Sequence, residues 1–127
     1  LLQTKDLPKR EKLYEICNGF FKAVKPTILH GDLWSGNFLI SSEGIPFLID
    51  PSIYYGDHEV DIAMTKLFGG FSPSFYEAYE QHHSIKKHYA QRIELYQFYY
   101  LLVHLNLFGQ SYYKSVTKII NKYWHKQ

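Results

Sequence analysis

The chain has little of what marks secreted, membrane-bound or nucleic-acid-binding proteins. Its 127 residues include one cysteine, so no internal disulfide can form, and we expect a reducing, cytoplasmic setting. The net charge of +2 gives no broad electrostatic attraction for nucleic acid. The most apolar stretch, residues 95–108, is interrupted by three polar residues and is too short to cross a bilayer, so we expect no role for a membrane.

What the chain does contain is apolar and aromatic. Hydrophobic residues make up 46% of the sequence and aromatic residues 18%, which is enough to build a substantial core. The length suits one domain covering residues 1–127.

Helical patterns cover most of the chain. Apolar residues at helical spacing predict a helix over residues 8–24. Further helices are predicted over residues 59–68, 72–82, 92–108 and 111–124. The segment 92–108 is apolar nearly all round, which predicts a central buried helix.

The most informative segment is polar. Residues 30–37 read His-Gly-Asp-Leu-Trp-Ser-Gly-Asn and lie between two short apolar runs, 27–29 and 38–40. A third apolar run, 45–49, ends at Asp50. The pattern predicts short strands flanking a polar loop.

The last two apolar runs predict a hairpin with residues 43–44 at its tip. In that register Leu39 faces Leu48, and Asn37 lies opposite Asp50. An amide oxygen and a carboxylate would then meet at the open end of the hairpin.

These residue types suit phosphoryl transfer from a nucleotide. Asp32 can accept the proton of a substrate hydroxyl, and Asn37 and Asp50 offer the oxygen ligands that Mg²⁺ prefers. Asp32 and Asn37 are five positions apart, as in the kinase catalytic loop. Gly31 and Gly36 suit a sharply turning loop. The alternative is that these polar residues only form turns and cap a strand.

These motifs carry a family resemblance. Residues 30–37 resemble the catalytic loop of the aminoglycoside phosphotransferase-like kinases, which carry H-G-D-x-x-x-x-N. The Leu-Trp-Ser-Gly version of this loop, followed by characteristic residues, more particularly resembles the fructosamine kinase (ketosamine 3-kinase) family. The characteristic segments are 49–52, 54–63, 67–71 and 104–109.

The resemblance implies an α+β, mainly α fold: the C-terminal lobe of a protein kinase-like protein with a small hairpin that carries the metal site. It implies ATP-dependent phosphorylation of a sugar hydroxyl on a ketoamine, either a fructosyl-amine or a glycated protein, with Mg²⁺ as cofactor. In the family this phosphorylation primes the adduct to break down, which amounts to deglycation.

Other residues are expected around this loop. Trp34 is expected to stack on the acceptor, although plain packing explains a tryptophan equally well. Tyr55 and His58 are expected to help shape the acceptor site. The residues expected to hold the loop in place are His30, Glu59 and Asp61.

A kinase of this type also needs a nucleotide-covering lobe with a phosphate loop and a strand lysine. No G-x-G-x-x-G occurs in the chain. We therefore expect the N-terminal lobe to be missing, the chain by itself to be inactive, and its uncovered apolar surface to favour self-association or a partner.

Three alternatives stay open. The same loop could serve a kinase of an aminoglycoside, choline or another small alcohol. A truncated lobe could act as a non-catalytic binding module. A metal hydrolase could use Asp32 and Asp50.

Overall fold

The computed structural model describes residues 2–22 and 24–125. Its helices are α1 (Arg10–Phe20), α2 (Glu59–Phe68), α3 (Pro73–His82), α4 (Tyr89–Phe108) and α5 (Tyr113–Ile120). Its strands are β1 (Thr27–Leu29), β2 (Phe38–Ile40), β3 (Pro46–Leu48) and β4 (Tyr54–Gly56). Short 3-10 turns occupy Thr4–Asp6, Ser35–Asn37 and Gln110–Tyr112, and a π-helical turn, Asn121–His125, follows α5. The mainly helical α+β fold predicted from the sequence is confirmed.

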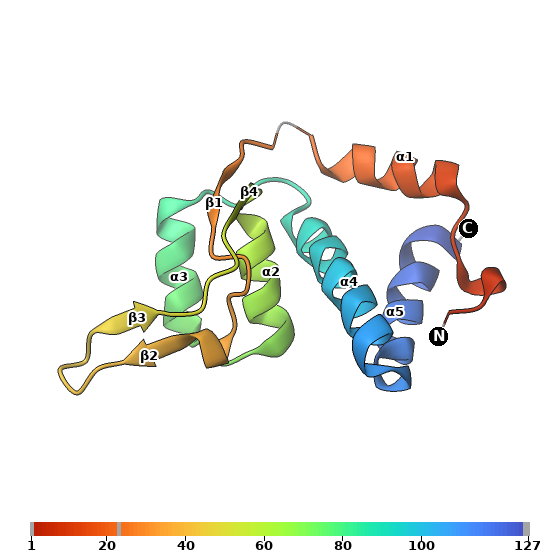
Figure 1. Cartoon of the computed structure of the whole chain (residues 1–127). Coiled ribbons are helices and arrows are strands. Elements are labelled where there is room, and N and C mark those ends of the chain that lie inside the picture. Colours follow the sequence, from red (N-terminus) through yellow and green to blue (C-terminus); the bar gives the residue numbers. More distant parts are fainter. Residues whose placement is uncertain (1, 23, 126–127) are drawn as a thin grey trace.

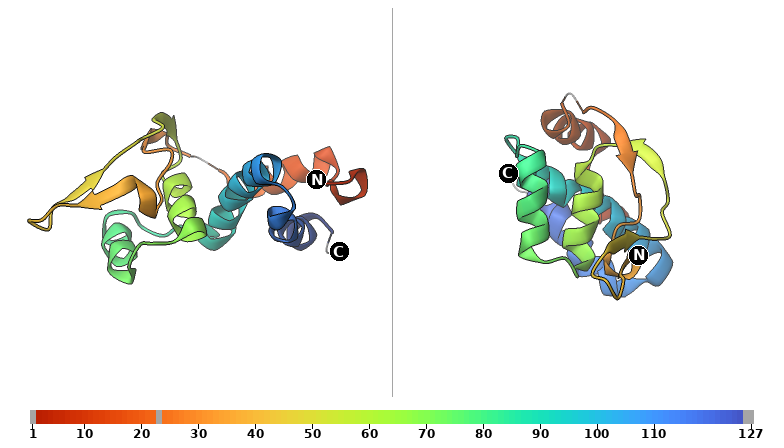
Figure 2. Two further views of the ribbon diagram at one scale, coloured as in Figure 1. Left: turned by 60° about the horizontal axis from the view of Figure 1, so that its bottom comes forward. Right: turned by 90° about the vertical axis from the view of Figure 1, so that its left-hand side faces the viewer.

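The strands form two separate antiparallel pairs, β1 with β4 and β2 with β3. The β2–β3 hairpin projects away from the helices, whereas β1 and β4 run beside α2 (Figures 1 and 2). Helix α2 packs on α4, and α4 packs on α5. The polar loop between β1 and β2 therefore joins the helical body to the projecting hairpin.

The core has two parts that share α4. Its larger part joins α4 to α5 and Trp124, and its smaller part joins α4 to α2, with α3 packed on the outside. Ile62, Leu105 and Ile120 are almost completely buried. Burying each such side chain stabilises the fold by about 1.5–3 kcal/mol. Within the described ranges, no helix is both long and apolar enough to span a membrane.

The helix predictions are mostly confirmed, with corrections at the ends. Helix α2 has the predicted bounds, and α3 begins one residue later than predicted. Helix α1 ends at Phe20, whereas the predicted helix runs to residue 24. Residue 23, which belongs to this prediction, lies outside the described residues. The Asn18-Gly19 pair weakens the helix there, and the Phe21 N–H caps the Cys17 carbonyl.

The predicted central helix α4 is shared by both parts of the core, but it is not buried along its whole surface. Buried residues such as Leu101 and Leu105 occupy one side, whereas Tyr99, Leu107 and Phe108 are exposed. The sequence pattern could not separate the two sides because apolar residues occur on both. The exposed aromatic side of α4 is therefore available to line a site.

The predicted hairpin exists, but its register is shifted by one residue. Phe38 pairs with Leu48 and Leu39 with Phe47, so Asn37 lies opposite Ile49, whose N–H donates to the Asn37 carbonyl over 3.0 Å. The cause is a three-residue tip that ends at Gly44, whose φ of 79° a glycine adopts without strain. Asp50 therefore follows the last hydrogen-bonded pair instead of belonging to it.

A buried ion pair fixes α2 to α4. The Arg92 guanidinium donates two hydrogen bonds of 2.6 Å to the Glu59 carboxylate and a third to the Lys87 carbonyl. Both side chains are almost fully buried. A two-pronged pair of this kind is strong and directional, so it sets how the first turn of α2 sits against α4.

Breaking this pair should cost far more than breaking an exposed one. Arg92→Met leaves the Glu59 carboxylate buried without its partner, so we expect a loss of about 3–5 kcal/mol in the free energy of unfolding, measured with urea. The control is Lys122→Met, which breaks the exposed Lys122–Glu94 pair and should cost about 1 kcal/mol or less. Equal losses in both variants would contradict the structural role given to Arg92.

Candidate active site

The loop that follows β1 turns sharply at Gly31. Its φ is 82°, and a Cβ atom placed there would lie 1.9 Å from the Ser52 carbonyl oxygen. Only glycine fits so close an approach. The Ser52 N–H also donates to the His30 carbonyl over 2.8 Å, so the loop is bound directly to the segment that follows Asp50.

The Asp61 carboxylate holds the same turn from the other side. Its two oxygens accept hydrogen bonds from the His30 N–H at 2.8 Å and the Gly31 N–H at 2.9 Å. Asp61 lies in the first turn of α2, where a negative charge also suits the helix dipole. The loop is thus attached to the helical body through two consecutive backbone N–H groups at its sharpest bend.

His30 uses both ring nitrogens within the loop. Its Nδ1 accepts from the Asp32 N–H at 3.3 Å, so Nε2 carries the proton and donates to the Ile49 carbonyl at 2.9 Å. A ring bonded in this way positions the backbone of Asp32 and is not available as a base.

Asp32 and Asn37 are in direct contact. The Asn37 side-chain N–H₂ donates to the Asp32 carbonyl at 2.8 Å and to its carboxylate Oδ2 at 2.9 Å. These bonds point the amide nitrogen at Asp32 and leave Asn37 Oδ1 as an oxygen that can meet a cation. They also leave Asp32 Oδ1 able to accept a proton or hydrogen bond from a ligand.

Asp50 has an unusual backbone. Its φ is 48°, in the left-handed region that aspartate tolerates better than most residues. Among the described residues, no group of three or more His, Cys, Asp or Glu side chains is arranged to hold a metal ion. Mg²⁺ beside nucleotide phosphates commonly takes only one or two protein ligands, and one amide oxygen with one carboxylate fits that chemistry.

Trp34 packs across its own loop. A Cβ atom on Gly36 would lie 2.4 Å from the Trp34 ring, so the glycine makes room for the indole. The turn is supported from behind by the α2–α3 connection, where Gly70 lies directly against Ser35. Trp34 is 41% exposed, so part of its ring still faces solvent.

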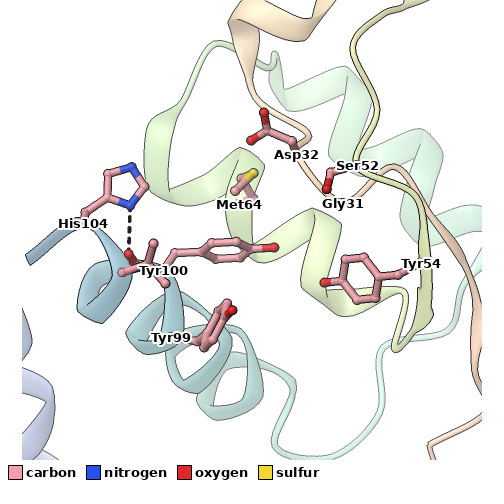
Figure 3. A pocket seen from close by; sticks show the side chains of 9 residues that line it. Gly31, Asp32, Ser52, Tyr54, Met64, Tyr99, Tyr100 and His104 are labelled. Atoms are coloured by element: carbon pink, nitrogen blue, oxygen red, sulfur yellow. Dashed lines mark hydrogen bonds between the residues drawn. The ribbon is translucent and has the colours of Figure 1, made fainter. Parts of the chain in front are cut away.

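Two adjoining cavities open beside Asp32. The first, about 640 Å³, lies between the loop, β4 and α4 (Figure 3). It is lined by Gly31, Asp32, Ser52, Tyr54, Met64, Tyr99, Tyr100, Val103 and His104. The second, about 320 Å³, is lined by Asp32, Trp34, Met64, Phe68, His104, Phe108 and Tyr112. The first offers several polar groups, whereas the second is mainly aromatic.

The structure keeps two of the residues expected at the acceptor site away from these cavities. Tyr55 is 71% exposed, because side chains alternate along β4 and the neighbouring Tyr54 takes the inward position. His58 lies at the start of α2 and its Nδ1 hydrogen-bonds the Tyr79 hydroxyl of α3. Burial lowers the pKa of His58, so its ring favours the neutral form. Glu59 is bound to Arg92 and supports the helix that carries Asp61.

The residues that the sequence reasoning missed come from β4, α2 and α4. Tyr54, Met64, Tyr100 and His104 all line the first cavity. Tyr100 and His104 are four positions apart on α4, a spacing that puts two side chains on one face of a helix. That spacing was a usable signal. Tyr54 could not be found in this way because β4 itself was not predicted.

The fold is mainly helical, and its H-G-D-x-x-x-x-N loop is bound to a helix and followed by a hairpin and an aspartate. Together these features define a protein kinase-like lobe. Solved structures agree with this class. A protein from Haemophilus somnus 129PT, named "Putative fructosamine-3-kinase", has a structure that aligns with a TM-score of 0.75 and 33% identity, covering 88% of this chain and 38% of that one. A protein of the same name from Thermobifida fusca has a structure that aligns with a TM-score of 0.76 and 30% identity. The alignment covers 94% of this chain and 42% of that one.

Sequence comparisons narrow the class to a family. The fructosamine kinase family model matches residues 3–126. A Lactiplantibacillus plantarum protein named "Probable ketoamine kinase" is 52% identical over 100 residues, which is 79% of this chain and 36% of that protein. A relative from Enterococcus faecium, also named as a probable ketoamine kinase, is 46% identical over 102 residues, which is 80% of this chain and 37% of that protein. The chain belongs to the fructosamine kinase family, and it spans about a third of the length of these curated relatives.

Proposed function

We propose that the chain is the C-terminal lobe of an ATP- and Mg²⁺-dependent kinase that phosphorylates a sugar hydroxyl of a ketoamine. The observation that carries this proposal is the hydrogen-bonded Asp32–Asn37 pair, in which Asp32 lines two cavities of ligand size and follows a turn whose backbone is held by Asp61. Membership of the fructosamine kinase family supports the acceptor class. Phosphorylation would prime the ketoamine to break down, and a single half-buried cysteine suits a cytoplasmic setting.

Three side chains share the chemistry. Asp32 Oδ1 accepts the proton of the acceptor hydroxyl as its oxygen forms a bond to the γ-phosphorus and the bond to the ADP oxygen breaks. Asn37 Oδ1 and the Asp50 carboxylate would hold Mg²⁺, which neutralises charge on the phosphates when bound. The hydrogen bond from Asn37 to Asp32 keeps the base and the metal ligand in a fixed relation.

The nucleotide and the acceptor would approach from opposite sides of Asp32. The Asp50 side of the loop adjoins the hairpin, and the cavities lie on the α4 side. In-line transfer would place the γ-phosphorus between the acceptor hydroxyl beside Asp32 and the leaving ADP oxygen, because these two oxygens lie on opposite faces of the phosphorus. Trp34 lines the second cavity and suits stacking on the acceptor. Tyr55 and His58 line neither cavity, so the proposal gives them no contact with the acceptor.

The exposed apolar residues of the β2–β3 hairpin support the presence of a second lobe that covers them. Leu39 and Phe47 lie on one face of β2–β3, Ile40 and Leu48 lie on the other, and each is more than half exposed. Phe38 packs on Phe71 at the base of the second face, but the rest of this apolar hairpin is uncovered on both faces, which is unfavourable in water. We propose that an N-terminal, nucleotide-covering lobe packs here in the complete enzyme.

The acceptor class can be tested in the two-lobed kinase. With Mg²⁺ and ATP, a fructosyl-amine should be phosphorylated on its sugar, which phosphorus NMR of the product would establish. The panel should include choline, an aminoglycoside and free fructose. Turnover of choline or the aminoglycoside alone would overturn the ketoamine assignment.

The roles of the two carboxylates can be separated. Asp32→Asn should lower kcat by about a hundredfold or more while ATP–Mg²⁺ affinity stays near normal, because Asp32 meets the acceptor. Asp50→Asn tolerates the same backbone conformation, so only charge is lost, and both nucleotide affinity and turnover should fall. Equal loss of nucleotide binding in the two variants would contradict this division.

The 127-residue chain should behave differently by itself. One or two oxygen ligands give a weak Mg²⁺ site, so calorimetry should detect no tight ATP binding, and no fructosyl-amine should be phosphorylated. Sedimentation should reveal self-association through the hairpin, which Leu39→Ser weakens and Leu7→Ser, at a similarly exposed site elsewhere, does not. Micromolar ATP affinity with ordinary turnover would refute the need for a second lobe.

A further inference from the structure

The second cavity beside Asp32 lies between two unlike sets of residues. The loop contributes Asp32 and Trp34. The helical body contributes four aromatic rings, those of Phe68, His104, Phe108 and Tyr112. Its volume of about 320 Å³ is at the lower end of the range of small-molecule sites, so it suits one part of a ligand and not a whole nucleotide.

The four rings of the helical body form a curved wall around His104. The centroid of the His104 ring lies 4.7 Å from that of Phe68 and 5.2 Å from those of Phe108 and Tyr112. The planes of these rings are inclined to that of His104 by between 36° and 55°, so they do not form a flat stack. His104 Nδ1 donates to the Tyr100 carbonyl at 2.8 Å (Figure 3), which holds the central ring in place.

The charge beside these rings is negative and lacks a cationic partner. Within residues 2–22 and 24–125, neither a lysine nor an arginine lines the two cavities, and Asp32 takes part in no salt bridge. The Asp32 carboxylate accepts a hydrogen bond from Asn37, which is uncharged. Aromatic faces attract cations, and a nearby carboxylate adds to that attraction. A cavity with both features favours an organic ammonium over a neutral or anionic group.

We propose that the second cavity binds the ammonium group of the acceptor, with the rings of Trp34 and Phe108 contacting the cation and Asp32 supplying the opposite charge. This inference rests on the proposed kinase function and names the part of the acceptor that the site selects. The nitrogen of a ketoamine is an alkylamine, which is protonated near neutral pH, and one CH₂ group joins it to the sugar. The ammonium can therefore enter the second cavity while a sugar hydroxyl stays beside Asp32. The cavity thus distinguishes a ketoamine from free fructose by its charge.

The test replaces one ring and leaves the charge of the site unchanged. In the two-lobed kinase, Phe108→Leu should lower kcat/KM for an N-alkyl fructosyl-amine by roughly two- to thirtyfold, the range expected when one cation–π contact is lost. ATP affinity should not change. Phe108 is 64% exposed, so the urea midpoint of the kinase should also stay the same. Phe108→Tyr keeps the ring and should retain most of the activity.

The matched control is Tyr14→Leu. It removes an aromatic ring from a 53% exposed position on α1, outside both cavities. Neither kcat/KM nor the urea midpoint should change in this variant.

A neutral analogue separates cation binding from apolar packing. The analogue is the matching alkyl ether, in which oxygen replaces the acceptor nitrogen and the positive charge is absent. The wild type should prefer the amine, and Phe108→Leu should lower kcat/KM for the ether much less than for the amine. If the ether is bound but not phosphorylated, its inhibition constant is compared instead. Equal losses for the two compounds, or unchanged kcat/KM for the amine in Phe108→Leu, would overturn the assignment.

The outcome is separable from the proposed function. If the wild type phosphorylates only a different cationic alcohol, the ketoamine proposal fails, and the same comparison with that alcohol and its uncharged analogue still decides the role of the cavity. If neutral sugars are phosphorylated as well as the amine, the kinase function stands and the ammonium site is wrong. If nothing is phosphorylated, calorimetry with the fructosyl-amine decides: weaker binding in Phe108→Leu supports the site, and no binding to the wild type overturns it.

Discussion

The site depends on the carboxylate of Asp61. It accepts hydrogen bonds from two consecutive backbone N–H groups, those of His30 and Gly31, and such charge-assisted bonds are worth about 1.5–3 kcal/mol each. Everything that defines the site follows from where this turn is held: the backbone of Asp32, the contact between Asp32 and Asn37, and the wall that Gly31 and Asp32 give to the first cavity. Asp61 is held in turn through α2, which the buried Glu59–Arg92 pair fastens to α4.

This construction gives the loop two different sides. Toward the hairpin it carries Asn37, which is proposed as a ligand of Mg²⁺, and the His30 ring ties it to the Ile49 carbonyl just before Asp50. Toward α4 it borders cavities lined by tyrosines and other aromatic rings. Helix α4 therefore has two roles: Leu101 and Leu105 build the core, whereas Tyr100 and His104 line the site. The excess of apolar and aromatic residues around α4 reflects both roles and not complete burial.

Signals between residues close in the sequence predicted the loop. Features that depend on contacts between distant segments could not be predicted from the sequence. Asp32 and Asn37 are close in sequence, so their proximity could be anticipated, and α2 has clear end signals on both sides. The hairpin register could not be fixed by counting residues, because it depends on the positive φ of Gly44. Strand β4 is three residues long and pairs with β1, a distant segment. Without β4, the sequence could not decide that Tyr54 faces the cavity and Tyr55 does not.

Amide hydrogen exchange measured by NMR tests the role of Asp61 most directly, because it reports on the individual N–H groups of His30 and Gly31. Asp61→Asn keeps the size of the side chain but has only one acceptor oxygen, so it cannot accept from both groups. We expect these two amides to be protected in the wild-type chain and to exchange about tenfold faster or more in the variant. The amides of α4 should be unaffected. Unchanged protection at His30 and Gly31 would contradict the account.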